Sequence, residues 1–248
     1  MMRHRQVPLV RRFSPVPKSE ADEVREDIAR LFGASKPTGW EVIERKHRCV
    51  ILAGAGAGKT HEMLMRARYA VERGRPAFFI RIEDVEEGFE DAFEIGSAES
   101  FERWLDSPDD AWFFLDSIDE ARLSHPRAFE RAVRRFADRI EGAENRAHVI
   151  ISGRPYAWRA VTDRAMLERW LPFAAATVEA KDGSDDGTLV ERRVTDTESA
   201  LEVYVLRDLE EDDIRMFAAH HGVTATDDLI DALRRSNLLA LAVARQFG

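Results

Sequence analysis

The segment ILAGAGAGKTHEML, residues 51–64, places a run of Ala and Gly directly before a lysine and a threonine. A loop of such small side chains lets backbone N–H groups surround an anion closely, because an inward-pointing Cβ would collide with it. The helical pattern that begins at Lys59 adds unpaired N–H donors and a partial positive charge. This combination is typical of a site for the phosphates of a nucleotide.

The spacing Ala53-x-x-x-x-Gly58-Lys59-Thr60 matches the phosphate-binding pattern except at its first position, which is usually glycine. We expect Lys59 to contact the β- and γ-phosphates of ATP or GTP, and Thr60 to offer its hydroxyl to Mg²⁺. A chance turn rich in glycine is the alternative. The predicted nucleotide-binding residues are Gly54, Ala55, Gly56, Ala57, Gly58, Lys59, Thr60 and His61.

A second candidate site is the segment WFFLDSIDEA, residues 112–121. Asp116 ends an apolar run, where a carboxylate is costly without a function, and we expect it to hold Mg²⁺ together with Thr60. Asp119 and Glu120 follow a short turn, and one of them is predicted to orient or deprotonate the attacking water. The pattern does not decide between the two. A helix cap would explain one of these carboxylates but not three.

A third candidate is Arg154, which follows another apolar run in VIISGRPYAW. In a parallel sheet the carboxyl ends of all strands open on one edge, so Arg154 is predicted to lie on the side of the glycine-rich loop. Its fixed positive charge could stabilise a γ-phosphate. A surface arginine before a helix-starting proline is the alternative.

Short apolar runs alternate with helical patterns along the chain. This order predicts an α/β domain of three layers with a central parallel sheet, the layout of a P-loop NTPase, followed by a small helical segment. Helices are predicted at 59–74, with Met63, Ala67 and Val71 on one face, and at 124–140. The predicted strands are residues 49–53, 77–82, 111–116, 147–152 and 201–206.

The chain divides into three predicted parts. Residues 1–39 form an extension with one helix over 19–33. Its first arginines are expected to be solvated, with a weak basic arm as the alternative; they are Arg3, Arg5, Arg11 and Arg12. Residues 40–206 form the α/β domain, with a polar, flexible loop near 179–199. Residues 207–248 begin a helical domain that we expect to be incomplete, so that the chain is a fragment or a stand-alone module.

Composition excludes several other classes of protein. The formal net charge is −9, which disfavours nucleic acid or an anionic membrane as a partner. No apolar stretch approaches the length of a membrane span, and we expect a cytoplasmic protein without a cleaved leader. A lone cysteine, Cys49, excludes an internal disulfide and is predicted to be a core residue.

Residues 83–110 contain twelve acidic residues and a single basic one, Arg103. Aromatic residues are interspersed among the charges, so this segment is predicted to form helices with solvated acidic faces. Docking of a basic protein partner on those faces is the alternative.

Taken together, these sites resemble NACHT-type P-loop NTPases of the STAND class, a family of signal-transducing ATPases. The resemblance covers roughly residues 40–248 and rests on GAGAGKT, on Asp116-Ser117 followed by Asp119-Glu120, on SGRP with an extra Gly153, and on VLRDLEEDDI. It implies a central strand before the glycine-rich loop, next to the strands carrying Asp116 and Arg154. It also implies ATP-dependent switching in signalling or defence, with self-association controlled by the nucleotide.

Three functions remain open from the sequence. The first is an ATP-hydrolysing switch with Lys59, Asp119, Glu120 and Arg154 in catalytic roles. The second is an interaction module that holds a nucleotide with negligible turnover. The third, a nucleic-acid-dependent motor, is weaker because the chain is acidic and shows no basic channel.

Overall fold

The computed structural model describes residues 11–16, 36–173, 201–207, 211–220, 222 and 225–235. The predicted helix at 19–33 and the predicted loop at 179–199 lie outside these ranges. The strands are β1 (Phe13–Pro15), β2 (Arg48–Leu52), β3 (Ala77–Arg81), β4 (Phe93–Ile95), β5 (Ala111–Asp116), β6 (Ala147–Gly153) and β7 (Glu202–Leu206). The α-helices are α2 (Trp40–Ile43), α3 (Lys59–Glu72), α4 (Ala98–Leu105), α5 (Ile118–Ser124), α6 (Ala128–Arg139), α7 (Ala160–Trp170), α8 (Glu211–His220) and α9 (Thr226–Arg235).

The strands form one seven-stranded sheet in the order β1-β7-β2-β6-β5-β3-β4. The five inner strands are parallel to one another, while β1 and β4 pair antiparallel with β7 and β3 at the two edges. The predicted α/β class is therefore confirmed, and the predicted parallel sheet is correct for the inner strands but not for the two antiparallel edges. One part of the expected order is wrong: β2 does not lie next to β5, because β6 separates them.

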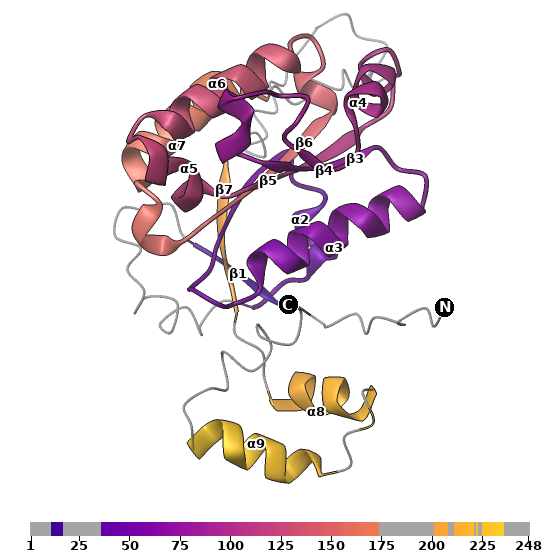
Figure 1. Ribbon diagram of the computed structural model, residues 1–248, viewed down its shortest axis with the longest axis vertical. Helices are drawn as coiled ribbons and strands as arrows, with labels where there is room; N and C mark the ends of the chain where they lie inside the picture. The colour runs from indigo at the N-terminus through magenta and orange to yellow at the C-terminus, as the bar shows by residue number, and fades with distance from the viewer. Residues whose placement is uncertain are drawn as a thin grey trace, which may run out of the picture.

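Helices cover both faces of the sheet, as Figure 1 shows, with α2 and α3 on one side and α4 to α7 on the other. Strand side chains alternate between two apolar clusters, as the period of two requires. In β2, Val50 and Leu52 join the larger cluster beneath α4 to α7, whereas Cys49 and Ile51 pack toward α2 and α3. Cys49 is fully buried, as predicted.

Helix α3 buries a slightly different face from the predicted one. Met63, Ala67 and Ala70 are buried, whereas Val71 is 47% exposed. Spacings of four and then three residues follow the 3.6-residue turn, so Ala70 continues the stripe and Val71 rotates away from the sheet.

The acidic segment 83–110 is predicted to be helical, but only part of it is. It contains a 3₁₀ turn at Glu83–Glu86, the edge strand β4, and α4 with a capping box at Ser97 and Ser100. A group of stacked and edge-to-face rings fixes it to the sheet. These rings belong to Phe78, Phe89, Phe93, Phe101, Trp104 and Phe113.

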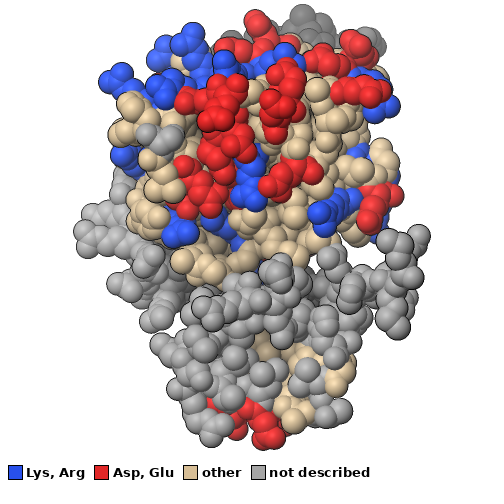
Figure 2. Space-filling model, in the orientation of Figure 1, with Lys and Arg blue, Asp and Glu red and all other residues tan. Residues whose placement is uncertain are grey.

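Three acidic side chains of this segment pair with arginines of helix α6. Arg131 of α6 pairs with Glu86, and Arg139 pairs with Glu90 and Glu102. Figure 2 accordingly shows Lys and Arg interspersed among the red acidic patches. Part of the negative charge that suggested a basic partner is thus compensated within the domain.

Helices α8 and α9 lie side by side, apart from the sheet (Figure 1). Arg12, the residue before β1, contacts both Arg207 after β7 and helix α8. The Arg207 N–H donates to the Arg12 carbonyl, and an Arg12 guanidinium nitrogen lies 3.6 Å from Asp213 of α8.

Candidate functional site

The glycine loop, residues 53–58, connects the end of β2 to the start of α3. Gly56 and Gly58 have φ angles of 75° and 81°, in the left-handed region that glycine adopts without strain. A Cβ built at Gly54 or Gly58 would meet no atom within 4 Å. Space is therefore open beside these two glycines, next to the start of α3.

Lys59 is the first residue of α3, and its side chain turns into the protein. Its ammonium lies 3.9 Å from Asp119 Oδ1, and both side chains are largely buried. A buried ammonium beside an open glycine loop is suited to binding phosphate oxygens.

Thr60 and Asp116 are brought together as predicted. The Thr60 hydroxyl donates to Asp116 Oδ2 at 2.7 Å, and Ser152 donates to the other carboxylate oxygen. Asp116 is fully buried at the end of β5. Because β6 lies between β2 and β5, its Ser152 is the residue that fills the space beside the carboxylate.

Asp119 and Arg154 also meet at this edge of the sheet. Arg154 Nε lies 2.9 Å from Asp119 Oδ2, and the Arg154 backbone N–H donates to Asp119 Oδ1 at 3.1 Å. The Asp119 carboxylate therefore bridges Arg154 and Lys59. The structure thus gathers all the predicted catalytic side chains around the carboxyl ends of β5 and β6.

Glu120 differs from Asp119 in its surroundings. Its side chain is 37% exposed, and Oε2 lies 3.7 Å from an Arg81 guanidinium nitrogen. That oxygen is buried without a hydrogen-bond partner. The nearby Glu83 has a raised pKa, because of burial first and then, among smaller causes, the charge of Glu120. Glu120 Oε2 thus makes an ion-pair contact but no hydrogen bond, whereas both Asp119 oxygens are engaged by Lys59 and Arg154.

Sequence reasoning missed Arg81 and Ser152. Arg81 ends β3, and one guanidinium nitrogen lies 3.5 Å from Asp116 Oδ2. Both residues occupy the carboxyl ends of parallel strands. The rule that predicted the place of Arg154 would have found them as well.

The prediction that the first arginines are solvated is wrong for Arg11. Strand β1 pairs with β7, which places Arg11 against the glycine loop, where it is almost fully buried. Its guanidinium donates to the Ala57 carbonyl at 2.8 Å and lies 3.8 Å from Glu62 of α3. His61, predicted to bind nucleotide, is half-buried on α3, and burial lowers its pKa.

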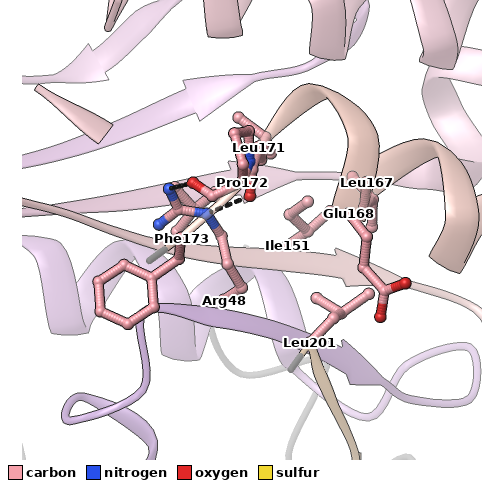
Figure 3. A pocket seen from close by; sticks show the side chains of 9 residues that line it. Arg48, Ile151, Leu167, Glu168, Leu171, Pro172, Phe173 and Leu201 are labelled. Carbon is pink, nitrogen blue, oxygen red and sulfur yellow. Dashed lines mark hydrogen bonds between the residues drawn. The ribbon is translucent and has the colours of Figure 1, made fainter. Parts of the chain in front are cut away.

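A separate pocket of about 140 Å³, drawn in Figure 3, lies beside Arg48 at the start of β2, whereas the glycine loop follows the end of that strand. Arg48, the first residue of β2, donates there to the carbonyls of Leu171 and Pro172. Burial lowers the Arg48 pKa to about 10. The Arg48 guanidinium is thus engaged in hydrogen bonds to the backbone, and we assign the pocket a structural role.

Comparisons with known proteins do not identify the chain. Neither the protein-family models nor the curated proteins contain a match to it. Among the described helices, none is both long enough and apolar enough to cross a bilayer. The fold and the site geometry therefore carry the functional argument.

Proposed function

We propose that the chain binds ATP with Mg²⁺ at the glycine loop and hydrolyses it slowly. The observation that carries this proposal is the hydrogen bond from Thr60 to Asp116. It joins a hydroxyl at the start of α3 to a fully buried carboxylate at the end of β5. These two groups are the protein ligands that nucleoside triphosphatases use for Mg²⁺.

The loop and Lys59 are suited to the phosphates. The open space at Gly54 and Gly58 leaves room for oxygens beside backbone N–H groups, and Lys59 adds a full charge. GTP fits these contacts equally well, because they involve no base.

Thr60 and Asp116 would hold the metal. In the described part of the chain, no group of three or more His, Cys, Asp and Glu side chains could hold an ion by itself. This fits Mg²⁺, which takes one or two protein ligands and completes its shell with phosphate oxygens and water. When bound, Mg²⁺ would neutralise charge on the phosphates.

Glu120 is the better candidate for the residue that accepts a proton from water. Its Oε2 has no hydrogen-bond partner, whereas Asp119 is occupied by Lys59 and Arg154. Arg154 would stabilise charge on the γ-phosphate from the same edge of the sheet. Asp119 then acts as a partner of the two cations.

From the resemblance of its motifs we further propose that the chain is a switch of the NACHT type in signalling or defence, in which the nucleotide controls self-association. A second candidate is a module that holds nucleotide with negligible turnover. It is favoured by the 3.7 Å contact of Arg81 with Glu120, because Arg81 then competes with a water molecule for that carboxylate oxygen.

Equilibrium binding of ATP with Mg²⁺ tests the proposal. Lys59→Ala should weaken ATP binding at least tenfold by this account, because it removes the charge beside the loop. Lys46→Ala is the matched control, since Lys46 precedes β2 at the far end of the strand and pairs with Glu202. Equal ATP affinity in wild type, Lys59→Ala and Lys46→Ala would refute nucleotide binding at this site.

A further inference from the structure

A single carboxylate, that of Asp119, holds the two cations expected to bind phosphate. Its Oδ1 lies 3.9 Å from the Lys59 ammonium and accepts the Arg154 backbone N–H at 3.1 Å. Its Oδ2 lies 2.9 Å from Arg154 Nε. Lys59, Asp119 and Arg154 come from α3, α5 and the end of β6, so the carboxylate connects three separate elements.

We propose that Asp119 is an internal counter-anion that determines which phosphate ligand the site prefers. It competes with the ligand for Lys59 and Arg154, and it disfavours a triphosphate relative to a diphosphate. The inference rests on the proposed function, because it uses the phosphate contacts assigned there.

The competition follows from charge and burial. A phosphate that takes up Lys59 and Arg154 brings negative charge to the place where the carboxylate lies, and like charges at short range repel. If the carboxylate loses its cations, it remains a buried charge with fewer partners, which is costly. The Asp119 side chain is only 5% exposed, so water compensates little of this loss.

The preference follows from which contact each ligand must break. A diphosphate that reaches Lys59 has to displace only the 3.9 Å contact. A triphosphate that also engages Arg154 has to displace the 2.9 Å ion pair as well. Shorter ion pairs are stronger, so Asp119 reduces the affinity for the triphosphate more than the affinity for the diphosphate.

Other roles for Asp119 predict weaker or unchanged binding when its carboxylate is removed. If it coordinated the metal or held Lys59 and Arg154 in a binding geometry, its removal would lower the affinity for the phosphate ligand. If it served only as a general base, its removal would slow turnover and leave affinity unchanged. The direction of the affinity change therefore distinguishes the proposed role from these others.

The test is calorimetric binding of three probes with Mg²⁺: a non-hydrolysable ATP analogue, ADP and inorganic tripolyphosphate. Asp119→Asn should bind the analogue and tripolyphosphate about tenfold more tightly than wild type, and ADP less than threefold more tightly. Glu202→Gln, which removes a carboxylate paired with Lys46 at the far end of the sheet, is the control and should change the affinity for each probe less than threefold. Asp119→Ser replaces Asp119→Asn if the amide variant does not fold.

A double-variant cycle isolates the ion pair. In an Arg154→Gln background, the tenfold gain from Asp119→Asn should fall to the small gain seen for ADP. If folded Asp119→Asn binds the analogue and tripolyphosphate no more tightly than wild type, the proposal that Asp119 is a counter-anion is overturned. If tripolyphosphate binds Asp119→Asn more tightly but neither nucleotide binds any variant, the counter-anion stands and the nucleotide function fails.

Discussion

The Thr60 hydroxyl donates a hydrogen bond to Asp116 Oδ2 across 2.7 Å, although the two residues are 56 positions apart in the chain. Thr60 lies on α3, which follows β2, and Asp116 ends β5; strand β6 lies between β2 and β5, and its Ser152 binds the other oxygen of the same carboxylate. Two hydroxyls thus fix both oxygens of a buried carboxylate at the edge of the sheet where the glycine loop begins. This relationship is the basis of the proposed metal site.

The hydroxyl at position 60 can be tested separately from the side-chain shape. Thr60→Ala should lower the affinity for ATP in the presence of Mg²⁺ about tenfold, because it removes a metal ligand. Thr60→Ser keeps the hydroxyl and should bind ATP nearly as wild type. Titrations with and without Mg²⁺ measure the difference. If Thr60→Ala loses no Mg²⁺-dependent affinity, the assigned metal site is wrong.

Arg11 should stabilise the glycine loop. In Arg11→Ala the Ala57 carbonyl loses its buried donor, which is expected to cost about 1–3 kcal/mol of unfolding free energy and to weaken ATP binding. Urea unfolding and ATP titration measure both effects. Arg45→Ala, at an exposed position just after α2, is the control and should change neither. Similar stability of both variants would contradict a supporting role for Arg11.

His47 should make stability depend on pH. Burial, followed by the charges of His148 and Arg48, lowers the His47 pKa from 6.5 to about 4. The ring is stacked between Phe173 and His148, and the His148 pKa is also lowered, chiefly by burial. Since the unfolded chain takes up the proton first, the stability due to neutral His47 is present above pH 6.5 and is lost as pH falls toward 4.

The variant His47→Phe keeps the stack and removes the titration. Unfolding free energies measured between pH 7.5 and 4.5 should fall less steeply in the variant, by on the order of 1 kcal/mol over that interval. Parallel curves for the two proteins would show that protonation of His47 is not linked to folding.

The aromatic cluster should anchor the acidic segment. Phe101 is fully buried and contacts the rings of Phe78, Phe89 and Phe113. Phe101→Ala is expected to lower the free energy of unfolding, measured with urea, by about 3–5 kcal/mol, because it leaves a cavity between α4 and the sheet. Leu123→Ala removes a side chain that is 85% exposed and should cost little. Comparable losses in the two variants would contradict this view of the core.

The inner part of the fold was predictable because each inner strand is a short apolar run between helical patterns. The edge strands were not, since FSP in β1 and FEI in β4 are three residues long and show too little alternation to be recognised. The order of the strands was also missed. Insertion of β6 between β2 and β5 depends on long-range pairing, which local patterns do not encode.

The candidate site was predictable where a motif combined with the edge rule for parallel strands. That rule brings Thr60, Asp116 and Arg154 to one edge, as the structure does. Arg11 could not be found in this way, because its place depends on the antiparallel pairing of β1 with β7. The different engagement of Asp119 and Glu120 depends on side-chain contacts that sequence spacing does not determine.

Single-turnover hydrolysis of ATP by the wild-type protein, beside Glu120→Gln, tests the central claim most directly. We predict that wild type binds ATP with Mg²⁺ and releases phosphate slowly. Glu120→Gln should bind ATP with similar affinity and cleave it at least 100-fold more slowly, because the amide cannot accept a proton from water. Hydrolysis at the wild-type rate by Glu120→Gln, or no ATP binding by wild type, would contradict the account.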